Sequence, residues 1–186
     1  MNAAPDVLAR IARLITSDLA EYAHARRLAA QTDPGGSSLD SQPPFDPDEE
    51  LMAEYDRRII DQDLRAATRS RFVSKHYADA VESGVKALNE CVRAKSGSTL
   101  DGDSLMTNVF SVQTPVLRLN RLRSDSDKSE QRGHMMMCQA VVAAWRNPRA
   151  HSSQVEDSPD KAIMMLEQLQ HLMEITRSAV RTRRKK

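Results

Sequence analysis

Residues 75–97 decide the fold class, and their sequence is KHYADAVESGVKALNECVRAKSG. Small or apolar residues recur here at spacings of three and four, which places them on one face of an α-helix. These residues are Tyr77, Val81, Gly84, Leu88 and Cys91. Glycine often follows the last turn of a helix, because it adopts the left-handed backbone conformation found there. The stretch therefore predicts a helix over about 75–95 that ends at Gly97.

The same helical period continues on both sides of this stretch, while no segment alternates convincingly between apolar and polar residues. Alanine and methionine are frequent and β-branched runs are few, which also favours helices. The other predicted helices cover residues 5–31, 47–71, about 101–110, about 127–147 and about 158–180. The sequence therefore predicts an all-α fold, an antiparallel helical bundle with an N-terminal helical extension.

Proline and acidic residues mark the predicted helix ends. Asp46-Pro47-Asp48-Glu49 and Ser158-Pro159-Asp160 are both typical helix starts. Pro148 is expected to end the helix before it, because the residue preceding a proline avoids the helical conformation.

These boundaries predict five segments along the chain. Residues 32–47 are a linker rich in proline, glycine and serine. The other segments are an N-terminal helix at 1–31, a connecting helix at 48–70, the bundle at 71–180 and a basic tail at 181–186. We expect the helices before the bundle to pack on it or on a partner.

The composition restricts the function classes. The 27 Lys and Arg residues nearly balance the 26 Asp and Glu residues, so the net charge is +1 and any phosphate-binding surface must be local. Cys91 and Cys138 lie in apolar helical patterns, which favours reduced thiols in a cytosolic protein over a disulfide. No zinc-type spacing and no apolar run of 18 residues occurs. We therefore expect a cytoplasmic protein with no metal, no cofactor and no membrane span.

Residues 146–151, RNPRAH, carry the candidate chemistry. A guanidinium fits phosphate oxygens, and an imidazole exchanges a proton near neutral pH. RNA supplies its own nucleophile, the 2′-hydroxyl, so these groups suffice for cleavage without a metal ion. We expect His151 to act as general acid or base and Arg146 to stabilise the transition state. Asn147 would bind a phosphate oxygen or orient His151.

One histidine cannot conveniently transfer both protons of this reaction, whereas two copies of His151 in one cleft can. Symmetric dimers are the commonest oligomers, so we expect a homodimer with one composite site. The run from Met135 to Met137 is expected to serve core and dimer packing.

A purely structural interpretation of the same residues stays open. The Arg-Asn-Pro sequence also suits a helix end, where Arg149 can bind the terminal carbonyls. A lone histidine in a loop is usually a surface residue. The basic tail can contact RNA phosphates or form a solvated chain end. Its candidate RNA-binding residues are Arg183, Arg184, Lys185 and Lys186.

Several short segments in a fixed order carry a family resemblance. They are KHYADAV at 75–81, DG at 101–102, LM at 105–106, FS at 110–111, LN at 119–120, SEQRG at 129–133 and RNPRAH at 146–151. This series resembles the Ymh-type family of bacterial proteins, and over about 70–178 it is similar in turn to the HEPN superfamily. Lys75 stands where the series is expected to have glycine.

The resemblance implies a dimeric bundle of four or five helices that cleaves RNA without metal, as a toxin or antiphage defence effector. It assigns catalysis to Arg146, Asn147 and His151. It also implies a helical Glu-Lys pair, which Glu82 and Lys86 match, although such a pair is also an ordinary surface stabiliser. The secondary site candidates are Glu82, Lys86, His76 and Arg149.

A second function class fits the same sequence. The bundle can serve as a non-catalytic dimerisation or adaptor module that binds a partner protein in a defence system. Residues 1–69 lie outside the resemblance and are the expected partner-binding part.

Overall fold

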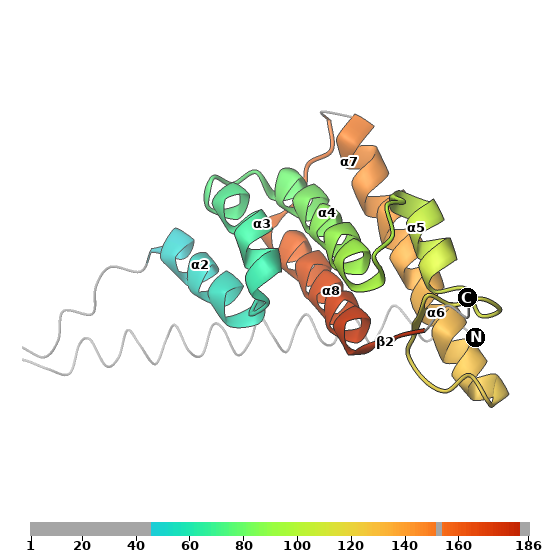
Figure 1. Ribbon diagram of the computed structural model, residues 1–186. Coiled ribbons are helices and arrows are strands. Elements are labelled where there is room, and N and C mark those ends of the chain that lie inside the picture. The colour runs from blue at the N-terminus through green and yellow to red at the C-terminus, as the bar shows by residue number, and fades with distance from the viewer. Residues whose placement is uncertain (1–45, 152–153, 183–186) are drawn as a thin grey trace, which may run out of the picture. The chain divides into compact units, whose positions relative to one another are not determined.

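Helices dominate the computed structural model of the chain, which describes residues 46–151 and 154–182 (Figure 1). The helices are α2 (Pro47–Arg58), α3 (Gln62–Val73), α4 (Tyr77–Ser96), α5 (Gly102–Val109), α6 (Asp125–Val141), the π-helix η1 (Val142–Arg146), α7 (Asn147–His151) and α8 (Pro159–Ser178). The predicted all-α class is confirmed. The helix predicted at 5–31, the linker up to residue 45 and the tail residues 183–186 lie outside the described residues.

Helix ends lie where their capping residues predict. Asp46 Oδ1 accepts the Asp48 N–H at 2.9 Å at the start of α2. The Ser158 hydroxyl accepts the Lys161 N–H at 3.3 Å at the start of α8. Gly97 follows α4 with φ of 70°, in the left-handed region. Each N-cap of this kind typically contributes about 1 kcal/mol to stability.

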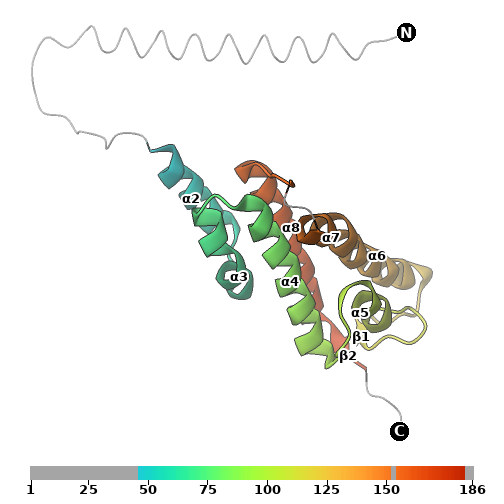
Figure 2. The ribbon, with the colours of Figure 1, turned by 90° about the horizontal axis from the view of Figure 1, so that it is seen from above.

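The core is built on the packing of α4 against α8, which lie side by side in both views (Figures 1 and 2). Their close approach depends on Gly84. A Cβ atom at this position would lie 2.8 Å from side-chain atoms of both Leu166 and Leu169, closer than carbon atoms can approach. The small residue in the predicted apolar stripe is therefore the point of closest contact.

The two central helices run parallel, which corrects the predicted antiparallel arrangement for this pair. Gly84 lies beside Leu166, and Cys91 contacts the carbonyl of Met173 further along both helices. Short loops force only consecutive helices to run antiparallel. The chain between α4 and α8 contains α5, α6, η1 and α7, so it can return and run in the same direction again.

Other neighbouring helices do run antiparallel. One such pair is α5 and the segment α6–η1. Gly102 at the start of α5 lies beside Arg146 at the end of η1, whereas Phe110, just after α5, packs on His134 in α6. This arrangement places the loop before α5 against η1, where the candidate site lies.

The single helix predicted over 47–71 is two helices, which corrects the connecting helix placed at 48–70. Ile59 has an extended backbone, and Asp61 starts α3 by accepting the Leu64 N–H at 3.0 Å. The break lets α3 fold back, so that the rings of Tyr55 and Phe72 pack with centroids 4.6 Å apart. Both rings belong to the same hydrophobic core as the bundle.

Pro148 does not end its helix, which corrects a further prediction. The helical segment runs from α6 through η1 to His151, and Pro148 is the second residue of α7. Before it, the Asn147 N–H bonds to the Val142 carbonyl in a π turn. Proline normally clashes with the carbonyl four residues earlier, and the wider π turn accommodates its ring.

A short pair of strands closes one end of the bundle. β1 (Leu117–Arg118) pairs antiparallel with β2 (Val180–Arg181), and the Thr182 N–H bonds to the Val116 carbonyl. Arg181, predicted to begin the basic tail, is therefore part of a strand. Two residues are too few to produce an alternating pattern that the sequence could reveal.

Candidate functional site

The predicted motif lies on the continuous helical segment formed by η1 and α7 (Figure 1). Arg146 ends η1, while Asn147 and His151 are the first and last residues of α7. Asn147 and His151 are four residues apart and share one face of the helix. Residues five apart in a helix point about 140° away from each other, so Arg146 points to a different side from His151.

Arg146 is fixed by Asp101, the residue before α5. Its Nη1 donates to Asp101 Oδ2 at 3.0 Å, and 26% of the Arg146 side chain is exposed. Asp101 Oδ1 accepts hydrogen bonds from Asn89 Nδ2 at 3.1 Å and from Arg93 Nη1 at 3.2 Å. We call these four side chains the Asp101 cluster. Donors from α4 and from η1 thus converge on one carboxylate.

The Asp101 carboxyl stays ionised in this cluster. Partial burial raises its pKa, but the hydrogen bond and charge of Arg146, the Gly102 amide and the charge of Arg93 outweigh burial and hold the pKa below its ordinary value. Hydrogen bonds between charged groups are shorter and stronger than neutral ones. The ionised carboxylate therefore keeps the Arg146 guanidinium in one position.

The backbone around Asp101 turns its side chain toward Arg146. Asp101 is the N-cap of α5, yet its side chain makes no capping hydrogen bond, because it faces the cluster instead. Gly102 follows with φ of 57°, in the left-handed region that favours glycine. A Cβ there would lie 3.9 Å from Arg146 Nη1, an ordinary contact, so the backbone conformation rather than space selects glycine.

Asn147 and His151 form the open part of the site. Both side chains are exposed, and neither hydrogen-bonds to any residue that the structure describes. Both side chains are therefore open to contact by a ligand. Arg146 immediately precedes Asn147 on the same helical segment.

Arg149, a secondary site candidate in the sequence, has a structural role. Only 4% of its side chain is exposed, and its Nε donates at 2.8 Å to Asp157, whose side chain is fully buried. Its Nη1 donates at 2.8 Å to the carbonyl of Trp145, which lies within η1 and not at a helix end. These contacts join α7 to the segment before α8.

Among the described residues, the other secondary candidates make no hydrogen bond or ion pair with the Asp101 cluster. Glu82 and Lys86 pair with each other at 2.6 Å, with Lys86 54% exposed. His76 is the exposed N-cap residue of α4 and makes no side-chain capping bond. It lines a hollow of about 450 Å³ together with Asp79 and Glu156. The tail candidates, Arg183 to Lys186, lie outside the described residues.

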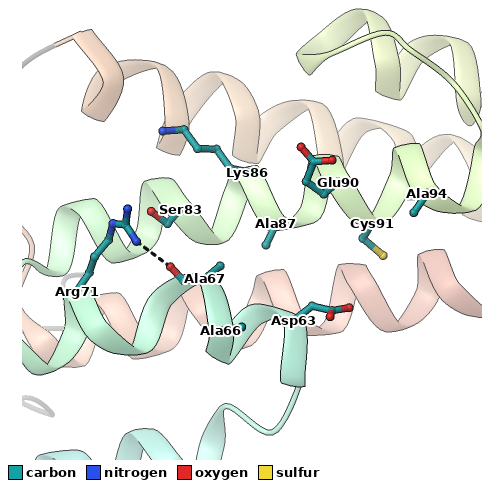
Figure 3. Close-up of a pocket in the computed structure, with 10 residues that line it drawn as sticks. All are labelled: Asp63, Ala66, Ala67, Arg71, Ser83, Lys86, Ala87, Glu90, Cys91 and Ala94. Carbon is teal, nitrogen blue, oxygen red and sulfur yellow. Dashed lines mark hydrogen bonds between the residues drawn. The ribbon is translucent and has the colours of Figure 1, made fainter.

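Two larger hollows lie on other faces of the bundle. One, of about 600 Å³, runs between α3 and α4 over the small side chains of Ala66, Ala67 and Ala87 (Figure 3). Lys86 and Glu90 point away from α3 at its edge. The other hollow, of about 480 Å³, lies between α6–η1 and α8. Its apolar lining includes Met137, Trp145, Met164 and Leu172.

Sequence reasoning missed the anchoring of Arg146 by Asp101. The available signal was the Asp-Gly pair before a predicted helix, together with Asn89 and Arg93 on one face of α4.

Among residues 46–151 and 154–182, no group of three or more His, Cys, Asp or Glu side chains is placed to hold a metal ion. Within the same ranges, no helix is both long and apolar enough to cross a membrane.

Comparison with known proteins adds one relationship. A model of the family described as "Protein of unknown function (Hypoth_ymh)" matches residues 58–175. The matched range includes the Asp101 cluster and residues 146–151. No curated protein and no solved structure matches the chain.

Proposed function

The chain belongs to the Hypoth_ymh family of proteins of unknown function, and we propose that it is a metal-independent endoribonuclease that acts as a homodimer. One observation carries the proposal. Arg146 is fixed by Asp101, whereas the neighbouring Asn147 and His151 are exposed and have no hydrogen-bond partner in the described part of the chain. A positioned cation and an exposed imidazole on the same helical segment supply the two kinds of group that general acid–base cleavage of a phosphodiester needs.

The proposed reaction is an attack by the 2′-hydroxyl of RNA on the adjacent phosphorus. The 2′-oxygen bonds to phosphorus and the bond to the 5′-oxygen breaks, which yields a 2′,3′-cyclic phosphate and a 5′-hydroxyl. One neutral copy of His151 accepts the 2′-hydroxyl proton, and a second, protonated copy donates a proton to the 5′-oxygen. Arg146 and Asn147 bind the phosphate oxygens, whose negative charge grows in the transition state.

The homodimer in this proposal is supported by two features of the fold. Arg146 and His151 of one chain point to different sides of the helix, so a second copy supplies groups that one chain does not bring together. The surface of α6 and α8 beside the motif also carries exposed apolar side chains. Met136, Met137 and Met164 are 57%, 48% and 49% exposed. Exposed apolar patches commonly mark interaction sites.

The resemblance of residues 146–151 to the HEPN motif supports a biological setting for this activity. We propose that the chain acts in the bacterial cytoplasm as a toxin or antiviral defence effector that cleaves cellular RNA. The basic tail, which includes Arg183 and Arg184, would add contacts to RNA phosphates.

Cleavage of a defined RNA in excess EDTA tests the proposal. Wild-type protein should produce 2′,3′-cyclic phosphate ends, and His151→Ala should lower the rate by about 100-fold or more, because it removes the proton-transfer group. Arg146→Ala should cause a comparable loss. The control is Arg69→Ala, because that side chain is 50% exposed and lies on α3, outside the motif.

Both site variants must fold for the test to be informative, which circular dichroism and thermal unfolding establish. Equal cleavage by wild type and by folded His151→Ala would contradict the proposal. A cleavage activity that requires a divalent cation would also contradict it.

A non-catalytic adaptor function is the second candidate, and the exposed methionines favour it. Such an adaptor would bind a partner protein and leave RNA intact. Capture of one defined partner that is unaffected by His151→Ala, together with absence of RNA cleavage, would favour this alternative.

A further inference from the structure

We propose that Arg93 and Arg146 form a binding site for one phosphate of the RNA backbone, and that the Asp101 carboxylate occupies this site in the free protein. The inference rests on the proposed function for the role of Arg146. It adds Arg93 as a substrate-binding residue and Asp101 as a competitor that the RNA displaces.

The geometry around Asp101 is that of an anion site. Asp101 Oδ2 accepts from Arg146 at 3.0 Å, and Oδ1 accepts from Arg93 at 3.2 Å and from Asn89 at 3.1 Å. Guanidinium groups bind carboxylate and phosphate oxygens with the same donor geometry. A phosphate that replaced the carboxylate would therefore meet three donors already in place.

Asn89 provides an independent sign of a built site. It is a polar residue on α4 that is only 1% exposed, and its Nδ2 donates into the cluster. Its Oδ1 is buried and has no hydrogen-bond partner in the part of the chain that the structure describes. This oxygen only accepts and cannot bind a phosphate oxygen, so the contribution of Asn89 to the site is its buried Nδ2 donor, which a phosphate oxygen in place of Asp101 Oδ1 would meet.

Asp101 is placed so that it can leave the cluster. Its side chain is 45% exposed and makes no side-chain capping bond, so within α5 its departure breaks only the contact with the Gly102 amide. It lies in a short connection between Gly97 and Gly102, both with positive φ. Once it leaves, two guanidiniums and the positive end of α5 face the vacated position. Glu90 still pairs with Arg93 and holds that side chain near α4.

Removal of the Asp101 charge should strengthen RNA binding. We expect Asp101→Asn to bind a 2′-O-methyl oligoribonucleotide about tenfold more tightly than wild type, because the competing charge is gone. The 2′-O-methyl probe lacks the nucleophile, so binding is measured without cleavage. Asp103→Asn is the matched control, since it makes the same charge change two residues further on, in the first turn of α5. It should change the affinity less than about twofold.

Arg93 should account for the gain. Arg93→Gln in the Asp101→Asn background should return the affinity to the wild-type level or below. If Asp101→Asn fails to fold, Arg93→Gln alone decides, with an expected loss of about threefold or more against no loss for Arg71→Gln. Unchanged affinity in folded Asp101→Asn or in Arg93→Gln would overturn the inference.

Inorganic pyrophosphate separates the two sources of phosphate. A gain in Asp101→Asn for pyrophosphate but not for the oligonucleotide would overturn the assignment to the RNA backbone. Metal-independent RNA cleavage by wild type with no gain in Asp101→Asn would refute this site and leave the proposed function standing. A gain in Asp101→Asn without cleavage by wild type would do the reverse.

Discussion

Lys75 holds the turn between α3 and α4 in a conformation that glycine adopts more easily. Its φ is 62°, in the left-handed region, where a residue with a Cβ atom is strained by on the order of 1 kcal/mol. The lysine side chain pairs with Asp48 at 2.6 Å, but both groups are more than 60% exposed, so the pair offsets little of this strain. Glycine adopts this backbone conformation without strain, which explains why the sequence series is expected to have glycine at position 75.

His134 should make the stability of the protein depend on pH. The ring is 2% exposed and packs edge-on against Phe110, and burial lowers its pKa from 6.5 to about 4. Between these values the unfolded chain binds a proton that the folded protein does not bind. The free energy of unfolding should therefore be highest above about pH 6.5 and fall toward pH 4, by up to roughly 3 kcal/mol from this residue.

Urea unfolding between pH 4.5 and 7.5 measures this dependence. His134→Gln should flatten the slope in that range, whereas His76→Gln, at an exposed position, should retain it. A wild-type slope that survives in His134→Gln would show that another group controls the pH dependence.

At the residue scale, the sequence predicts interactions within one element better than those between elements. Asp46, Ser158 and Gly97 could be identified as caps because each acts on its own helix. The partner of Arg146 could not, because Asp101 lies 45 residues away and the pairing depends on how α5 packs against η1.

The connection between α7 and α8 depends on the buried pair of Arg149 and Asp157. Burial raises the pKa of Asp157, but hydrogen bonds and charges from Lys161 and Arg149 outweigh it and keep the carboxylate ionised. Without Arg149, the buried Asp157 carboxylate keeps only the partly exposed Lys161 as a charged partner and loses the hydrogen bonds of the guanidinium. Arg149→Met should therefore lower the free energy of unfolding by about 1–3 kcal/mol.

Chemical denaturation compares this buried ion pair with an exposed one. Arg69→Met is the matched control, because Arg69 is 50% exposed and its partner Asp56 keeps a second arginine, Arg65. It should cost less than about 1 kcal/mol. An equal loss of unfolding free energy in the two variants would show that Arg149 does not hold α7 to the segment before α8.

At the element scale, the pattern of apolar residues predicts that helices form but not how each one is interrupted. The period through 47–71 is continuous, yet Asp61 caps a new helix within it. The π turn before Arg146 adds one residue to a turn, which a run of alanine and valine does not reveal. The direction of α8 against α4 depends on the path of all the helices between them.

The assembled molecule should be a dimer whose interface includes the exposed methionines of α6. Met137→Glu places a charge on this surface, so it should shift the molecular mass measured by light scattering from two chains toward one. RNA cleavage should fall in parallel, because the proposed site needs both copies. Val73→Glu is the control at an apolar position 50% exposed on α3. An unchanged mass in Met137→Glu would place any interface elsewhere.

The most direct test of the account compares RNA with the same oligonucleotide carrying 2′-O-methyl groups, in excess EDTA, for wild type and His151→Ala prepared identically. We expect cyclic phosphate products from wild type with RNA alone, and none from the variant or from the methylated strand. Cleavage of the methylated strand, or equal cleavage of RNA by both proteins, would contradict it.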